Sequence, residues 1–200
     1  MRRKHCEITD HQQIERILAS TNVGRLATNG ADGYPYITPV NFVYHQEKIY
    51  FHCAKKGEKL DNMARDPKVC FEVDIPLAYL DAGTDPDRRI CKVHQLYHCV
   101  IIRGQSRIVP DGSLKVAALN DLVAKHENCS DHELVNQEMP AFKACEVVEI
   151  TPTCISAKSD LAQNKAPEER FALARYLKNR NWPGDSEAVK AMGFDPNDMD

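Results

Sequence analysis

Three lysines around one glycine form the strongest candidate for a binding site in this sequence of 200 residues. Lys55, Lys56 and Lys59 surround Gly57, at the start of a predicted helix over 58–65. A glycine-containing turn that leads into a helix presents free backbone N–H groups and the positive end of the helix dipole. Because anions bind readily at such a helix start, the spacing predicts a phosphate site. The alternative is a turn whose exposed lysines are only solvated.

The elements on both sides of this turn are expected to hold it in place. Strand-forming residues over 49–52 predict a strand that leads into the turn. The helix over 58–65 has its apolar residues on one face and is ended by Asp66-Pro67. Alternating apolar residues over 69–73 predict the next strand.

The chain before the turn predicts one helix and an antiparallel meander. A helix is expected over 10–18, followed by a strand over 23–28. A short polar turn connects it to a second strand over 34–44. Pro35 and Pro39 interrupt that second strand, and proline in a strand indicates a sheet edge or a bulge.

The chain after the lysine turn predicts fewer regular elements. Residues 74–89 contain prolines, a glycine and four aspartates, which is typical of a loop. A long strand or bent pair is expected over 90–109. Ser113 is expected to cap a helix over 113–123, and the last strand is expected over 144–151.

The C-terminal part of the chain predicts two helices. Pro167 at a first helical position, followed by acidic residues, is a favourable helix start. Trp182-Pro183-Gly184 ends this helix, and Asp185 is expected to cap a short final helix closed by Gly193. This tail packs across a partner subunit or folds back on its own domain, and the sequence does not decide between the two.

Composition excludes several classes of protein. Apolar residues make up 42% of the chain and charged residues 28%, which is typical of a soluble globular protein of one domain with an appendage. The net charge of −3 argues against a nucleic-acid partner. No apolar run approaches the ~20 residues of a membrane span, so no membrane partner is expected. The basic start is not followed by an apolar segment, so no signal peptide is expected.

The eight cysteines contain no C-x-x-C pair, which favours reduced thiols in the cytoplasm over a disulfide framework. Two groups have metal-ligand residue types: Cys91, His94 and His98, and His126, Cys129 and His132. Neither spacing is a known zinc pattern, and side chains on a loop or strand scatter rather than converge. We therefore expect no metal at these positions.

The lysine turn and its neighbours resemble a known family. The matching residues are Tyr50 to Ala54, Gly57, Lys59-Leu60, Pro67 and Val69 to Val73; further matches are Arg25 to Thr28, Pro39 to Phe42 and Tyr97 to Gly104. Together they resemble the pyridoxamine 5′-phosphate oxidase-like, FMN-binding split barrels, and most closely the nitroimidazole-resistance, nitroreductase-like branch. The resemblance covers residues 2–158. It implies a mainly β fold with flanking helices: a split β-barrel of six or more mostly antiparallel strands over 1–158, with a C-terminal helical extension over 159–200.

The resemblance also implies a cofactor site. The FMN phosphate is expected on the turn over 53–59, and the flavin ring against the strands at 25–28 and 40–42. The implied cofactor-binding residues are Arg25, Leu26, Ala27, Thr28, Val40, Asn41, Phe51, His52, Cys53, Lys55, Lys56, Lys59, Leu60, Tyr97 and Cys99. Cys53 replaces the usual serine or threonine, and Cys99 replaces a serine or glutamine. Both changes weaken a hydrogen bond, because a thiol is a poor donor.

Three of these residues have alternatives that stay open. His52 is the implied catalytic residue, as a proton donor or acceptor near neutral pH or as a haem ligand. Its alternative is an imidazole that only fills space beside the lysines. Arg25 has the alternative of a surface ion pair, and Asn41 that of a turn or bulge residue bonded to its own backbone.

The implied function is that of an FMN-dependent oxidoreductase. It reduces a small organic molecule of the nitroimidazole or nitroaromatic kind with electrons from a nicotinamide, and works as a homodimer with FMN at the subunit interface. No G-x-G-x-x-G motif is present, so a nicotinamide binds only transiently. The alternatives are a haem-binding or haem-degrading split barrel and a non-catalytic flavin-binding protein. Pyridoxamine phosphate oxidation itself is disfavoured, because the C-terminal arginine pattern of that enzyme is missing.

Overall fold

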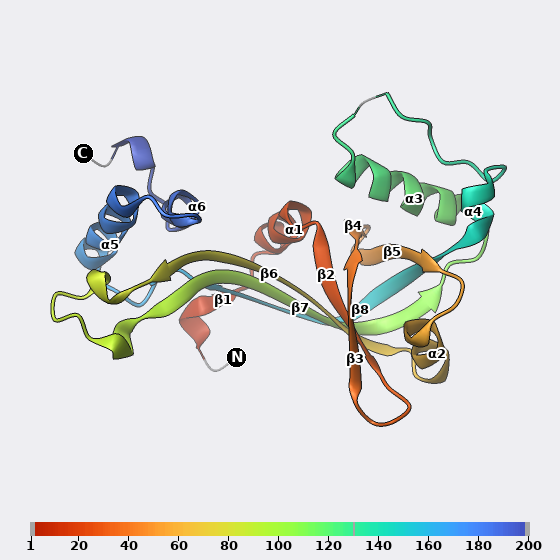
Figure 1. The fold of residues 1–200 in the computed structure, drawn as a ribbon, viewed down its shortest axis with the longest axis horizontal. Helices are drawn as coiled ribbons and strands as arrows, with labels where there is room; N and C mark the ends of the chain where they lie inside the picture. The colour runs from red at the N-terminus through yellow and green to blue at the C-terminus, as the bar shows by residue number, and fades with distance from the viewer. Residues whose placement is uncertain (1–2, 130, 199–200) are drawn as a thin grey trace. The chain divides into compact units, whose positions relative to one another are not determined.

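The computed structural model describes residues 3–129 and 131–198, and Figure 1 shows its elements. The strands are β1 (Glu7–Ile8), β2 (Val23–Asn29), β3 (Pro35–Asn41), β4 (Val43–His45), β5 (Lys48–Ala54), β6 (Lys68–Leu80), β7 (His94–Ile108) and β8 (Cys145–Asp160). The α-helices are α1 (His11–Ser20), α2 (Glu58–Arg65), α3 (Ser113–His126), α4 (Pro140–Ala144), α5 (Pro167–Arg180) and α6 (Asp185–Ala191). Short 3-10 turns are η1 (Lys4–Cys6), η2 (Ala82–Thr84), η3 (Ile90–Lys92) and η4 (Pro196–Asp198).

The strands form one eight-stranded sheet in the order β3-β2-β6-β7-β8-β5-β4, with β1 paired to β8. The registers of β2 with β3 and β6, and of β5 with β4 and β8, are antiparallel. The two ends of this order, β3 and β4, are not hydrogen-bonded to each other, so the sheet is not closed. These findings confirm the predicted mainly β fold with flanking helices. They also explain the prolines of β3, because an edge strand tolerates residues that lack an N–H group.

The chain divides into two compact units. We call Met1–Asp10, Asp74–Cys99 and Ala157–Asp200 the terminal unit, and His11–Val73 with Val100–Ser156 the barrel unit. Strands β6, β7 and β8 contribute residues to both units. The helical extension expected from residue 159 therefore belongs to the same unit as residues 74–99.

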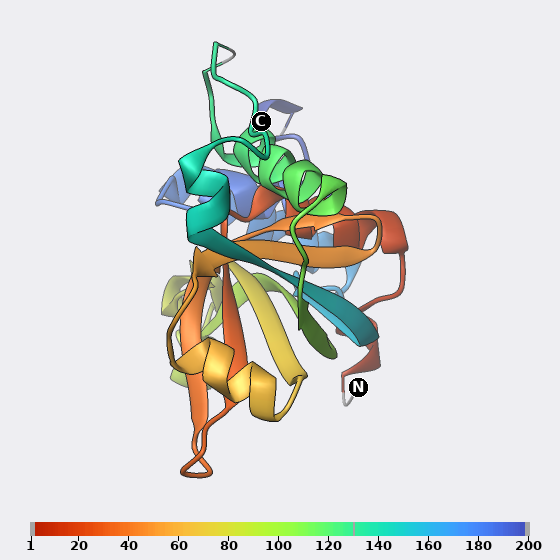
Figure 2. The same ribbon diagram turned by 90° about the vertical axis from the view of Figure 1, so that its right-hand side faces the viewer.

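The core of the barrel unit is made by alternating residues of its strands. In β2 every second side chain is buried, and Leu26 is fully enclosed. Phe42 and Phe71 meet edge to face, with 4.9 Å between their ring centroids. Gly24 has to be glycine because a Cβ atom there would lie 2.0 Å from the Phe71 ring. Helix α3 lies against β4 and β5, and helix α2 lies against β2 (Figure 2).

A buried carboxylate ties β5 to β7 and β8 within the barrel unit. Glu149 accepts hydrogen bonds from the Tyr50 hydroxyl at 3.0 Å, from Lys48 Nζ at 3.1 Å and from Arg107 Nε at 2.7 Å. Burial alone raises the pKa of the Glu149 carboxyl, but the hydrogen bonds from Arg107, Lys48 and Tyr50 outweigh it and hold the pKa at about 2. Glu149 is therefore an anion at neutral pH with several donors around it.

The terminal unit corrects the expected loop over 74–89. Strand β6 continues to Leu80, because Ala78 and Leu80 face a core that the C-terminal helices complete. That core also contains Leu96 of β7, and its helical members include Leu173, Ala174, Leu177, Ala188 and Val189. Local composition does not reveal this burial, since the partners lie about a hundred residues away. Helices α5 and α6 thus fold back on strands of their own chain.

Two expected helix caps are wrong by one residue. The N-cap of α3 is Gly112, with φ of +151°, rather than Ser113, and that of α6 is Gly184, with φ of +86°, rather than Asp185. A glycine has no side chain that could cap the helix. Glycine occurs at these two N-cap positions because the backbone there has a positive φ. Asp185 instead accepts hydrogen bonds from Arg180.

In the described part of the chain, no helix is both long and apolar enough to cross a membrane.

Candidate functional site

The predicted helix over 58–65 is confirmed as α2, and its start has the geometry of an anion site. Gly57 is the N-cap, with φ of +142° and ψ of +157°, a conformation that glycine alone adopts readily. Its carbonyl oxygen accepts the N–H groups of Leu60 at 2.9 Å and Asp61 at 3.2 Å. No side chain caps the first turn of α2. The earlier N–H groups of this turn are therefore directed out of the helix start.

The three lysines of the turn lack ion-pair partners in the described residues, although Glu58 and Asp61 lie in the first turn of α2 and the charge of Lys55 helps to lower the pKa of Asp111. Lys55 and Lys56 are exposed and Lys59 is half-buried, and none of their ammonium groups forms a hydrogen bond or ion pair there. Burial raises the pKa of the Cys53 thiol, and the charge of Lys59 partly opposes this rise. Cys53 is thus a neutral, buried thiol below the turn, while the positive charges remain available to a ligand.

Strands β2 and β3 place the second predicted group of residues side by side. Arg25 is opposite Pro39, Gly24 is opposite Val40, and β2 also pairs with β6 over Arg25–Thr28. Backbone groups of this part of β2 are therefore engaged on both sides, and only the edge strand β3 has a free side.

Arg25 forms the surface ion pair of its alternative interpretation, whereas Asn41 bonds the backbone of Asn22 rather than its own. Arg25 Nη1 forms an ion pair with Glu72 Oε2 at 3.1 Å. Asn41 donates its amide to the carbonyl oxygen of Asn22 at 3.2 Å. Both side chains remain exposed at the surface of the sheet.

Burial divides the predicted site residues of the barrel unit into two groups. The buried ones can meet a ligand only through their backbones: Leu26, Thr28, Val40, Phe51, Cys53 and Leu60. The accessible or half-buried ones offer side chains: Arg25, Ala27, Asn41, His52, Lys55, Lys56 and Lys59. The imidazole of His52 on β5 is exposed, in the same strand that leads into the lysine turn.

Tyr97 and Cys99 lie on the part of β7 that belongs to the terminal unit. Tyr97 lines a pocket of about 1080 Å³ there, and the Lys158 ammonium group lies 5.3 Å from its ring centroid. The pocket also includes Cys91 and His94. Within residues 3–129 and 131–198, no three His, Cys, Asp or Glu side chains converge as a metal site would require.

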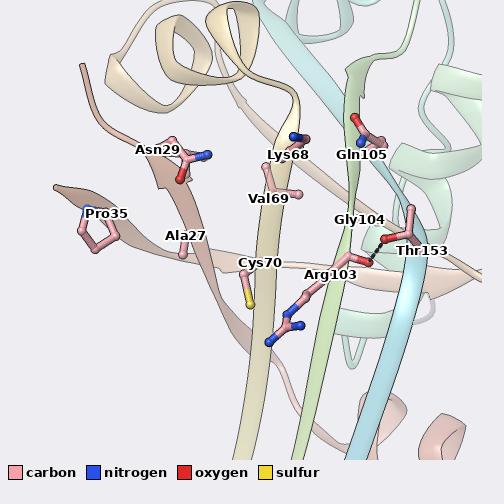
Figure 3. Close-up of a pocket in the computed structure, with 11 residues that line it drawn as sticks. Ala27, Asn29, Pro35, Lys68, Val69, Cys70, Arg103, Gly104, Gln105 and Thr153 are labelled. Carbon is pink, nitrogen blue, oxygen red and sulfur yellow. Dashed lines mark hydrogen bonds between the residues drawn. The ribbon is translucent and has the colours of Figure 1, made fainter. Parts of the chain in front are cut away.

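The barrel unit has a pocket of its own, which we call the strand-face pocket (Figure 3). Its volume is about 480 Å³, and it is lined by Ala27, Thr28, Asn29, Pro35, Lys68, Val69, Cys70, Arg103, Gly104, Gln105 and Thr153. Only Ala27 and Thr28 were predicted from the sequence. In Figure 3 the Arg103 side chain extends from β7 toward Cys70 on β6. Because every second side chain of a strand lies on the same face, the predicted site residue Cys99 would have indicated Arg103 and Gln105 as further site residues on that face of β7.

Comparison with known proteins identifies the family. The family model described as pyridoxamine 5′-phosphate oxidase matches residues 10–159. The chain therefore belongs to the pyridoxamine 5′-phosphate oxidase family, and the resemblance predicted from the sequence is confirmed.

Individual relatives are more distant. A 5a,11a-dehydrotetracycline/5a,11a-dehydrooxytetracycline reductase of Streptomyces rimosus is 29% identical over 100 residues, which span 48% of this chain and 61% of that protein. A candidate 5-nitroimidazole antibiotic resistance protein of Bacteroides thetaiotaomicron has a similar structure, with a TM-score of 0.64 at 20% identity over 76% of this chain and 86% of that one. The flavocytochrome Anf3 of Azotobacter vinelandii has a TM-score of 0.67 at 18% identity, over 92% of this chain and 80% of that one. The FAD and haem binding protein of Mycobacterium smegmatis also reaches 0.67, at 14% identity over 89% of this chain and 82% of that one.

Proposed function

We propose that this protein is a flavin-dependent oxidoreductase that binds FMN with its phosphate on the turn between β5 and α2. The observation that carries the proposal is the uncapped start of α2, where Gly57 and three lysines without ion-pair partners in the described residues occur together. A phosphate would receive backbone N–H groups and the positive end of the helix dipole there, and the lysines would neutralise its charge. Membership of the family, and the flavin named for two of the similar structures, support this choice of cofactor.

The accessible predicted residues would orient the flavin ring. The ring would lie against the outward face of β2, beside Arg25 and Ala27, with the free side of β3 available for hydrogen bonds. When bound, the flavin supplies the transfer of electrons between donor and substrate. His52, exposed at the end of β5, would hold or donate a proton beside the ring.

The remaining parts of the proposal concern partners. We infer a homodimer with FMN at the subunit interface, a nicotinamide as transient electron donor, and a small oxidised organic molecule as acceptor. The reductase activity named for the Streptomyces rimosus relative supports a redox reaction on a small molecule. Gel filtration with light scattering tests the dimer, and nicotinamide-driven reduction of a nitroaromatic separates an enzyme from a flavin-binding protein without activity.

The test of the phosphate site compares FMN with riboflavin, which lacks the phosphate. The purified protein should show flavin absorbance, and mass spectrometry of the released cofactor identifies FMN or FAD. Wild type should bind FMN at least about ten-fold more tightly than riboflavin, as expected for hydrogen bonds to a charged group. Lys59→Gln should reduce this preference, whereas Lys190→Gln, which removes an exposed charge of α6 in the terminal unit, should not. Equal affinity of wild type for FMN and riboflavin would disprove the phosphate site.

A haem-binding function is the second candidate. The exposed imidazole of His52 is free to ligate iron, and two similar structures are those of a flavocytochrome and of an FAD and haem binding protein. Titration with haemin tests this function. A Soret band that appears in wild type and is missing in His52→Ala would favour haem binding. The same Soret band in both proteins would exclude His52 as a ligand.

A further inference from the structure

We propose that the strand-face pocket binds an organic carboxylate as the substrate of the flavin reaction, with Arg103 as its main counter-charge. This inference rests on the proposed function for its chemistry, but the binding site itself is argued from the pocket. It extends the proposed substrate, a small oxidised molecule, to one that carries a negative charge.

The charge of the pocket is the first argument. Its lining contains two cationic side chains, Arg103 and Lys68, and no aspartate or glutamate. The guanidinium of Arg103 and the ammonium group of Lys68 form no hydrogen bond or ion pair with a described residue; Asp66, which accepts the backbone N–H of Lys68, lies outside the lining. Arg25, on the same sheet, is by contrast ion-paired with Glu72. The whole chain carries a net charge of −3, so this concave positive region is not a consequence of composition.

The shape and the neutral groups are the second argument. The lining combines an apolar part, made by Ala27, Pro35 and Val69, with the amide of Gln105. A few placed polar groups on a mainly apolar wall are typical of small-molecule sites. The volume of about 480 Å³ suits a molecule of one or two rings.

The position of Arg103 is fixed by its strand. Thr153 on β8 donates its hydroxyl to the Arg103 carbonyl oxygen at 3.0 Å, so the backbone that carries the guanidinium is held across the pocket wall. A guanidinium presents paired N–H groups that match the two oxygens of a carboxylate, whereas Lys68 offers a point charge. Arg103 is therefore the specificity-determining residue, and Lys68 contributes a weaker, less directional attraction.

The experiment uses two nitroaromatic probes of nearly equal size, 4-nitrobenzoate and neutral 4-nitrobenzamide. Equilibrium dialysis of the full chain measures the binding of each. Wild type should bind the carboxylate about ten-fold or more tightly than the amide, since a charged hydrogen bond contributes that much. Arg103→Gln should bring the two affinities close together, and Lys68→Gln should cause a smaller loss. Lys143→Gln, an exposed site outside the pocket, should keep the wild-type preference.

Further measurements separate this inference from the proposed function. Arg103→Lys keeps the charge without the paired donors, and it should retain only part of the preference. Flavin content is measured on the same samples and should not change in any of these variants. Absence of flavin in wild type would contradict the proposed function while leaving the dialysis result valid for the pocket. The pocket assignment is wrong if wild type binds both probes equally, or if Arg103→Gln keeps the full preference.

Discussion

At the scale of single residues, Glu149 is a buried carboxylate at the centre of a hydrogen-bonded network in the barrel unit. Its side chain is 2% exposed, while its partners Lys48 and Arg107 are partly exposed. The carboxyl pKa of about 2 lies below the ordinary 4.5, so the native state binds the proton less well than the unfolded chain. The stabilisation from this group is complete above pH 4.5 and is lost as the pH falls toward 2. Urea denaturation between pH 7 and pH 3 should show this loss in wild type.

The variant Glu149→Gln isolates that contribution. It should lower the free energy of unfolding at neutral pH by about 2–3 kcal/mol. This is less than the cost of breaking a fully buried ion pair, because water reaches the partner cations. The acid-induced loss should also become smaller in the variant. Glu133→Gln removes an exposed carboxylate and should change stability by no more than about 0.5 kcal/mol. A similar effect of both substitutions would contradict the role of the buried network.

Lys125 is a second group whose pKa the fold lowers, here because of burial alone. Its ammonium group lies 3.7 Å from the Phe42 ring centroid and donates to the Leu18 carbonyl oxygen at 3.0 Å. Burial lowers its pKa from 10.5 to about 8, so the unfolded chain binds more protons between these values. The contribution of Lys125 therefore makes the protein more stable as the pH rises from 8 to 10.5. Lys125→Met should remove this part of the slope in chemical denaturation, and Lys143→Met should retain it.

At the scale of elements, the turn before α2 depends on the backbone of Gly57. A Cβ atom there would meet no other atom within 4 Å, so the φ of +142° alone opposes a larger residue. Gly57→Ala should lower the free energy of unfolding by about 1–3 kcal/mol. Gly33→Ala is the matched control, because Gly33 also has open space but a φ of +86°, which other residues adopt at a lower cost. Thermal denaturation of both variants checks the order, and a larger loss for Gly33→Ala would contradict it.

Local signals explain which elements the sequence predicts. Helix α2 was predicted with its observed bounds because its apolar face and the Asp66-Pro67 stop both lie within a few residues. The end of β6 was not predicted from the sequence, because Leu80 is buried by helices that lie far along the chain. The lysine turn was found for the same local reason. Arg103 and Lys68 were missed as pocket residues, since strands distant in sequence must pair before they share a surface.

At the scale of the whole molecule, each unit has a core of its own, and one arginine secures the core of the terminal unit. The Arg180 side chain is 7% exposed and bonds Asp185 at 2.6 Å, Asp81 at 3.0 Å and the Tyr79 carbonyl oxygen at 2.9 Å. It therefore connects α5 to the start of α6 and to the end of β6.

Arg180→Met would leave Asp185 buried without its cation, at a cost of about 3–5 kcal/mol. The variant should raise hydrogen exchange in α5 and α6 well before it does so in α2 and α3, because the latter belong to the barrel unit. Arg175→Met, an exposed change in the same helix, should leave exchange in α5 and α6 as in wild type. Equal loss of protection in both units would mean that the two cores unfold as one.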